Sequence, residues 1–369
     1  MPVSTASPAP GRTASAVPFL AGSWAYEEWM AQDTHTLGTT AKTFLHQITP
    51  GGFLRGILFV ASSATGVLGT SAALTTDAPW SIITSMTLES IDGTPILYSL
   101  GGYAYYAVSR FCRPWDMDPA KDPATFSNSI NPKFRLRFFV EGRITIGVLP
   151  NTDARAQYRL RYTLSPLTAP ATSQTGLVTK ATGVTAPKVT ITLFLETYAQ
   201  PPQTDYAGNP IVQIPDGLTL QRFVSHQAGT ATNTGTFAIK SNRVGNLIRT
   251  LVYNFRGSNG KRANLTKDPI RLRLDNTQLW TRYRSSWTYE ISRFGSQQNA
   301  FDTSARPAGV YVYFRYHNPG QMDGDYWLPT TEASYLLGTF SGGPASGTLE
   351  TITEDLAPAG PVPAYLQGL

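Results

Sequence analysis

The chain has 369 residues, with 15% charged residues, 41% hydrophobic residues and a formal net charge of +6 at pH 7. This length suits two domains better than one hydrophobic core, and the charged fraction lies below the roughly 25% of an average soluble domain. Low charge indicates surface that is buried between strands or between subunits. The modest net charge, without a dense Lys/Arg tail, excludes direct condensation of a genome, and the single Cys112 excludes an intramolecular disulfide.

The first segment of the chain, residues 1–22, is predicted to be a flexible arm. Its first eighteen residues contain one charged side chain, Arg12, and four prolines, and they lack the apolar core of a signal peptide. A short helix is predicted next, from Ser23 to Gln32, because Ser23 can cap the first turn of the aromatic segment that follows it.

Alternating apolar and polar residues predict half-buried β-strands along the rest of the chain. The clearest segments are 134–138, 158–164, 189–193 and 270–274. Leu247 to Tyr253 and Val310 to Tyr316 are apolar on both faces, which predicts central strands or strands that a second layer covers. Asp92-Gly93 and Asn259-Gly260 provide the residues that tight hairpin turns need.

Helices are predicted to be few. Two further segments, Tyr98 to Phe111 and Arg282 to Phe294, are long enough for a helix between strands. The uncharged stretch Gly56 to Thr76 is not a predicted membrane span, because it contains seven Ser or Thr residues and three Gly residues. Many short strands without regular βαβ alternation predict an all-β chain with a β-sandwich in each half.

Three stretches of the first half recur in the same order in the second half. The first match aligns, without a gap, Thr43, Phe44, Gly52 and Leu54 with Thr236, Phe237, Gly245 and Leu247. The other matches align 91–97 and 106–111 with 274–280 and 289–294, and 149–154 with 328–333. A repeat of this length indicates a tandem domain, because solenoid and propeller repeats span ~20–50 residues. We therefore expect the two halves to superpose strand for strand.

The repeat also sets the predicted domain limits. Prolines and small polar residues interrupt the alternating pattern over 199–210, which marks a linker. The predicted organisation is the arm at 1–22, a first sandwich with its N-terminal helix at 23–200, a linker at 201–215 and a second sandwich at 216–369.

The tandem strand-rich domains, the aromatic segment after an arm, the proline-rich crossing and the length resemble a known family. It is the double jelly-roll major capsid proteins of tailless, membrane-containing icosahedral viruses of the tectivirus type. The resemblance is architectural and spans nearly the whole chain, since no short motif defines that family. It implies two tandem eight-stranded jelly-roll β-sandwiches and a coat subunit that is not an enzyme and needs no cofactor.

The resemblance further implies an assembly. Homotrimers of pseudo-hexameric outline would tile an icosahedral virion shell over an internal lipid membrane, after assembly in the host cytoplasm. The implied partners are other copies of the chain, neighbouring capsomers, minor capsid, vertex or membrane proteins and the membrane itself. Direct sequence-specific binding of nucleic acid is not expected.

The aromatic residues behind the arm are the first candidate contact. On the predicted helix, Tyr26, Trp29 and Met30 share a face beside Trp24, and such side chains settle at membrane interfaces. The resemblance places this segment on the inner side of the shell. These four residues are therefore candidate contacts with the membrane or with a neighbouring capsomer. The alternative is that the two tryptophans pack under the first sandwich, since the two glutamates between them would be repelled by anionic lipid.

A basic region is the second candidate contact. Between Arg243 and Arg284, only Asp268 and Asp275 oppose a series of arginines and lysines. Such a region can contact a neighbouring subunit, lipid head groups or nucleic acid, in that order of preference, and the alternative is a solvated strand face. The candidate basic contact face comprises Arg243, Arg249, Arg256, Lys261 and Arg262.

Enzymatic signatures are lacking in the sequence. The four histidines, His35, His46, His226 and His317, show no metal-ligand spacing, and no nucleophile elbow or phosphate-binding loop occurs. No catalytic, cofactor-binding or metal-binding residues are therefore predicted. Asp323-Gly324-Asp325, with Asp302 upstream, has oxygen ligands for a hard cation, but a turn is the preferred interpretation.

The alternative function is a two-domain β-sandwich that binds or cleaves carbohydrate, because paired carboxylates of a glycosidase meet only in space. It predicts a cleft lined with Trp and Tyr. A virion spike or tail adhesin is a third interpretation, and it accounts less well for the tandem duplication.

Overall fold

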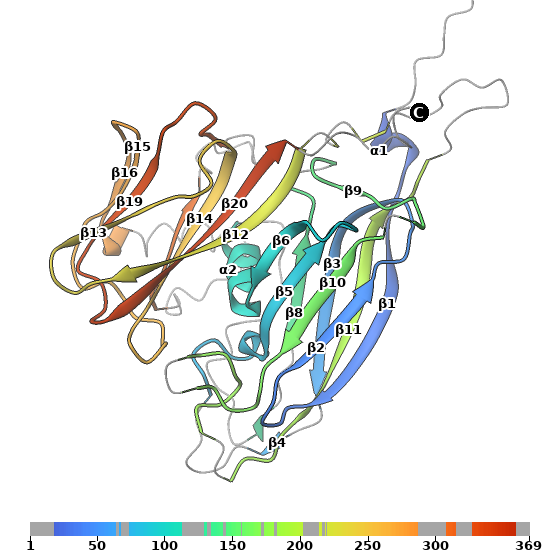
Figure 1. Cartoon of the computed structure of the whole chain (residues 1–369), viewed down its shortest axis with the longest axis horizontal. Coiled ribbons are helices and arrows are strands. Elements are labelled where there is room, and N and C mark those ends of the chain that lie inside the picture. The colour runs from blue at the N-terminus through green and yellow to red at the C-terminus, as the bar shows by residue number, and fades with distance from the viewer. Residues whose placement is uncertain are drawn as a thin grey trace, which may run out of the picture.

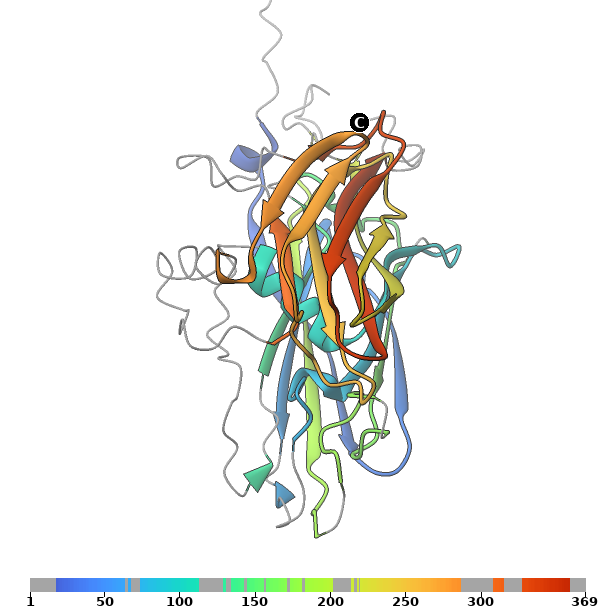
Figure 2. The same cartoon turned by 90° about the vertical axis from the view of Figure 1, so that its left-hand side faces the viewer.

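The computed structural model describes residues 18–63, 66–67, 74–112, 129–130, 134–142, 145–155, 157–170, 173–180, 183–201, 214–215, 218, 220–286, 308–314 and 327–358. These residues build two β-sandwiches that lie side by side, with a helix between them (Figures 1 and 2). Residues 1–17 of the predicted arm and 202–213 of the predicted linker lie outside the described residues, and the domain limits remain predictions.

The first sandwich consists of two antiparallel sheets. One sheet has the order β1 (Ala25–Thr36), β11 (Lys188–Tyr198), β3 (Phe53–Ser63), β8 (Phe134–Phe139). The facing sheet has the order β2 (Lys42–Gln47), β10 (Arg159–Leu164), β5 (Ile83–Glu89), β6 (Pro95–Leu100). Two short strands, β9 (Leu149–Pro150) and β4 (Gly66–Val67), pair with β3 and with β7 (Ser129–Ile130) respectively.

The second sandwich repeats this arrangement. Its first sheet has the order β12 (Leu220–Ala231), β20 (Gly347–Pro358), β14 (Leu247–Arg256), β17 (Val310–Phe314), and β18 (Leu328–Pro329) also pairs with β14. The facing sheet has the order β13 (Thr236–Lys240), β19 (Leu336–Ser341), β15 (Ile270–Leu274), β16 (Thr277–Arg282). In both sandwiches the first long strand pairs with the last, which is the connectivity of a jelly roll. The predicted fold class is confirmed.

The strands follow the predicted alternation. Every second residue of β11 from Val189 to Leu195 is buried, and β8, β10 and β15 lie where the sequence predicts them. β17 lies at the end of its sheet rather than at its centre, but Tyr311 and Val312, which point to opposite faces, are both fully buried. On one of these faces, Tyr313 contacts Trp280 of the facing sheet. The two apolar faces of β17 therefore reflect a covering layer.

The described helices are short. They are α1 (Phe19–Gly22), the 3-10 turn η1 (Trp80–Ile82) and α2 (Gly102–Cys112), with a further helical turn at 284–286. The predicted helix from Tyr98 is correct only from Gly102 onward, and the one predicted from Arg282 continues into residues outside the described ones. Among the described helices, none has the length and apolarity that a membrane span requires.

The helix predicted from Ser23 to Gln32 is wrong, because the chain is extended here and Ala25 to Gln32 lie in β1. β1 pairs with β11 along its whole length, from Ala25 opposite Tyr198 to Thr36 opposite Lys188, with a bulge after Trp29. A serine cap and helical spacing are weak local preferences, and a long partner strand that satisfies the backbone of β1 outweighs them.

The repeat is confirmed in its order, but the gapless alignment of the first match is wrong by one residue. β3 and β14 pair with the two Leu-Pro strands β9 and β18, and in these pairings Leu54 corresponds to Ile248 instead of Leu247. The second half therefore has one additional residue ahead of β14. Both strands also carry a bulge at an arginine, Arg55 in β3 and Arg249 in β14.

Two glycines that precede β3 and β14 allow a test of backbone packing. Gly52 and Gly245 both have positive φ, 70° and 104°. A Cβ at Gly52 would overlap the carbonyl oxygen of Tyr198, whereas a Cβ at Gly245 meets nothing within 4 Å. We expect Gly245→Ala to lower the free energy of unfolding by about 1–2 kcal/mol, from the left-handed backbone alone. Gly52→Ala should cost at least about 1 kcal/mol more, because the backbone must also move. Urea unfolding of both variants measures the difference, and equal losses would contradict the close approach.

Candidate functional site

The two sandwiches meet along β6 and β12, and α2 packs against β14 and β20. The ring centroids of Tyr98 and Phe223 lie 6.4 Å apart across this boundary. The guanidinium of Arg243 lies 5.1 Å from the Phe223 centroid and 5.8 Å from that of Tyr98. Two hydrogen bonds of 2.8 and 2.7 Å from Arg243 to Asp355 fix it there. This part of the boundary is thus a contact between two aromatic rings, which the Arg243 guanidinium, held by Asp355, stabilises.

A buried ion-pair group joins the same two sandwiches further along. Glu354 of β20 accepts hydrogen bonds from Arg222 Nε at 2.7 Å and from Arg249 Nη1 at 3.3 Å. Arg222 also donates to the carbonyl of Phe139, and Arg249 donates to that of Gly142 at 3.0 Å. Because both carbonyls belong to the first sandwich, each guanidinium holds the sandwiches together.

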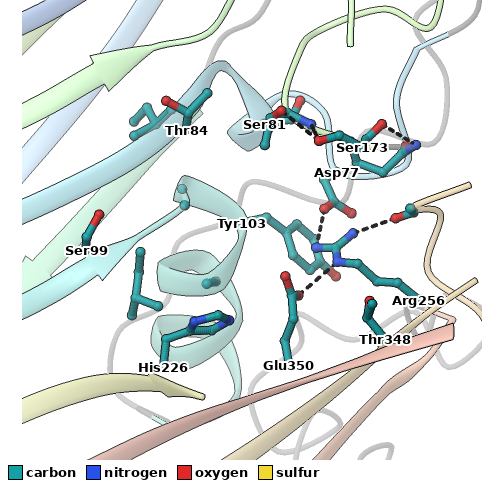
Figure 3. Close-up of a pocket in the computed structure, with 18 of the residues that line it drawn as sticks. Asp77, Ser81, Thr84, Ser99, Tyr103, Ser173, His226, Arg256, Thr348 and Glu350 are labelled. Atoms are coloured by element: carbon teal, nitrogen blue, oxygen red, sulfur yellow. Dashed lines mark hydrogen bonds and ion pairs between the residues drawn. The ribbon is translucent and has the colours of Figure 1, made fainter. Parts of the chain in front are cut away.

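A second ion-pair group lies between the sandwiches at the C-terminal end of β14 (Figure 3). Arg256 of β14 binds Asp77 at 2.7 Å and Glu350 at 2.9 Å, and Arg262 binds Asp77 at 2.8 Å. Arg262 also lies over the ring of Tyr103, 4.4 Å from its centroid. Burial alone would lower the pKa of the Arg256 guanidinium, but the two carboxylates raise it, so this side chain stays charged.

The second ion-pair group forms one wall of a cleft of about 560 Å³ between the sandwiches. Its lining is mostly small and polar, with Ser81, Thr84, Ser99, Ser173 and Thr348 around the ion pairs (Figure 3). Among the described residues that line it, Tyr103 is the one aromatic ring besides the imidazole of His226. The cleft that the carbohydrate alternative predicts, lined with Trp and Tyr, is not the cleft found here.

The charged residues of this cleft pair with one another and connect the two sandwiches. Asp77 and Glu350 both accept hydrogen bonds from Arg256, so neither carboxylate is free to act as the acid or the base of a glycosidase pair. Over the described part of the chain, no three His, Cys, Asp or Glu side chains gather to hold a metal ion. Asp302, the Asp323-Gly324-Asp325 segment and His317 lie outside the described residues.

The predicted basic contact face is placed differently from the expectation. Arg249 is buried, and Arg243, Arg256 and Arg262 are half-buried in ion pairs at the boundary between the sandwiches. Lys261 alone of the five is exposed. The arginines face inward because the carboxylates that they pair with stand on other strands and on the other sandwich. They do not form one solvent-facing surface.

The predicted aromatic contact residues lie on or just before the edge strand β1. Trp24 and Trp29 have 65% and 60% of their surface exposed, whereas Tyr26 and Met30 are half-buried. The two tryptophans therefore do not pack under the first sandwich. Their role as contacts with a membrane or a neighbour stays a prediction.

Sequence reasoning missed a polar cluster that closes this edge of the first sandwich. The Asp33 carboxylate lies 2.5 Å from His46 Nε2 and 2.5 Å from the Tyr162 hydroxyl, which donates to it. Burial, together with this bond to the carboxylate, raises the pKa of the Tyr162 phenol. The three residues come from β1, β2 and β10, so only the folded sandwich brings them together.

Two jelly rolls in tandem make this chain a double jelly-roll protein. No protein-family model and no curated protein matches its sequence. Its fold is similar to the atomic structure of Sulfolobus turreted icosahedral virus, with a TM-score of 0.64 and 13% identity over 94% of this chain and 93% of that one.

Two further virus structures are similar. The PBCV-1 virus capsid has a TM-score of 0.58 and 11% identity over 90% of this chain and 93% of that one. The major capsid protein of bacteriophage PM2 has a TM-score of 0.51 and 10% identity over 91% of this chain and 98% of that one. At these identities the similarity shows the fold, which is the double jelly roll that the sequence resemblance implies.

Proposed function

We propose that the chain is a major capsid protein, the coat subunit of a virus particle, and that it has no catalytic role. The observation that carries this proposal is the tandem pair of jelly rolls with one strand order. The three virus structures named above share this arrangement over at least 90% of the chain. The charge-poor composition and the exposed tryptophans support burial of further surface between subunits.

The assembled state that we propose is a homotrimer. Three chains with two similar sandwiches each present six similar units around one axis, which supports a pseudo-hexameric outline. Such trimers would tile an icosahedral shell over an internal membrane, in contact with minor capsid, vertex or membrane proteins. The chain would reside in the virion after assembly in the host cytoplasm.

The mass of the purified full-length chain in solution tests this proposal. We expect sedimentation to give three times the mass of the 369-residue chain, with an interface above the ~2,000 Å² at which obligate contacts begin. Dilution should not yield folded, stable monomers. A stable monomer that binds glycans would contradict the coat function and favour the carbohydrate alternative.

A further inference from the structure

The boundary inside the chain provides a template for a contact between chains. It joins the β6 edge of the first sandwich to the β12 edge of the second. Because the strand orders are the same, β1 corresponds to β12, and β16 corresponds to β6. β1 and β16 lie toward opposite ends of the long axis of the molecule (Figure 1). Each chain thus has, besides the pair of edges joined at the internal boundary, an equivalent pair: β1 at one end and β16 at the other.

Burial distinguishes the covered edges from the open ones. Three of the six residues of β6 are buried, but none of the six residues of β16. Four of the twelve residues of β12 are buried, but none of the twelve residues of β1. Among the described residues, β1 and β16 are the end strands of their sheets, and an open edge strand is a ready surface for another chain.

The residues on the open edge β1 correspond to those that form the internal boundary. The pairing of β1 with β11, compared with that of β12 with β20, places Tyr26 at the position of Phe223. It likewise places Trp29 at the position of His226. Phe223 contacts Tyr98 across the boundary, and His226 lines the cleft.

The open edge β16 shows the same correspondence. Leu97 and Trp280 hold equivalent places, opposite Leu88 and Leu272. Further along, Arg282 lies opposite Ile270 as Leu100 lies opposite Met86, so Arg282 takes the position of Leu100, which lines the cleft. Tyr283 follows it directly in the chain. Tyr283 has 58% of its surface exposed. The two open edges therefore carry large side chains where the internal boundary has its contacts.

The charges of the two open edges are complementary. Glu27 and Glu28 are exposed on β1. Arg282 lies on β16, and Arg271 and Arg273 are exposed on the adjacent β15. Opposite charges on two faces of one molecule favour contact between copies and disfavour contact of like faces.

We propose that the β1 edge of one chain, with Glu27, Glu28 and Trp29, docks on the β16 edge of a second copy, with Arg282 and Tyr283. The contact repeats head to tail, as the internal boundary does, and it closes into a ring when its rotation fits the number of copies. This inference rests on the coat function proposed above, and it assigns Trp29 to a neighbouring chain instead of to lipid.

Charge reversal in the full-length chain tests the docking edges. Glu27→Lys with Glu28→Lys, and separately Arg282→Glu, should each raise the dissociation constant of the trimer by about tenfold or more, because each places like charges together. The chain with all three substitutions should recover the trimer. Trp29→Ala should weaken the trimer without a charge change. Lys240→Glu, on the exposed edge strand at the far side of the sheet that contains β16, is the matched control. Sedimentation measures the masses, and thermal melting confirms that each variant is folded.

The outcomes separate this inference from the coat function. A wild-type trimer that both charge reversals weaken, and that the combined variant restores, supports the docking edges. A trimer that neither reversal changes overturns the docking edges and leaves the coat function standing. Folded reversal variants that stay dissociated even when combined also overturn them. A wild-type chain that is monomeric overturns the proposed trimer, and this contact with it.

Discussion

Replacing Glu354 with alanine is expected to lower the free energy of unfolding by about 3–5 kcal/mol, the usual cost of breaking a buried ion pair by removing one partner. The Glu354 side chain is fully buried, and those of Arg222 and Arg249 are 4% and 3% exposed. Without the carboxylate, two positive charges stay buried beside each other at the boundary between the sandwiches. The variant should therefore lose stability and also hold its second sandwich less firmly to the first. Urea unfolding, followed by fluorescence, measures the loss.

Two further variants calibrate this prediction. Glu354→Gln keeps the shape and a hydrogen-bond acceptor but removes the charge, so its loss should lie between those of wild type and alanine. Arg155→Ala removes an arginine whose side chain is 90% exposed and pairs with Asp153 at 3.2 Å. The urea midpoint of this variant should equal that of the wild type, because exposed ion pairs contribute little to stability. A midpoint for Glu354→Ala equal to that of Arg155→Ala would contradict the role of the buried group.

The fold could be predicted from the sequence because each half-buried strand of a jelly roll alternates apolar and polar residues. Alternation located β8, β10, β11 and β15, and the two Leu-Pro pairs at 149–150 and 328–329 marked equivalent strands in the two halves. What alternation did not predict was β1. Its residues fit a helix locally, and its conformation is decided by β11, more than 150 residues later in the chain.

The boundary between the sandwiches could not be predicted for a different reason. In the sequence, a series of arginines such as Arg243, Arg249 and Arg256 reads the same whether the side chains face solvent or pair with carboxylates. Their partners, Asp355, Glu354 and Asp77, stand on other strands or on the other sandwich, and no spacing in the sequence signals these pairs. Only the folded boundary shows that the charges are internal.

The duplication extends to a cluster of aromatic rings in each core. In the first sandwich, Phe44 stacks on Tyr162 with centroids 5.2 Å apart, and Phe59 meets Tyr162 edge-on at 5.5 Å. The three rings come from β2, β10 and β3, so the cluster joins both sheets. Such stacked and edge-on pairs add about 0.5–1.5 kcal/mol each to the burial of the rings.

In the second sandwich, Phe340 of β19 takes the place of Tyr162. Phe237 stacks on it at 5.5 Å, and Tyr253 and Phe255 meet it edge-on at 4.9 and 5.0 Å. Phe340→Ala is expected to lower the free energy of unfolding by about 3–5 kcal/mol, because a fully buried ring is lost and the cavity cannot collapse between two sheets.

Tyr162→Ala should cost a similar amount, since the two rings hold the same position in the duplicated core. Leu45→Ala, at a side chain with 56% of its surface exposed on β2 and outside the proposed docking edges, serves as the control and should change stability by no more than about 0.5 kcal/mol. All three are compared by urea unfolding at a fixed protein concentration, so that assembly contributes equally. If either core variant behaved like the Leu45 control, the two sandwiches would share their strand order without sharing a core, and the equivalence of their aromatic clusters would be wrong.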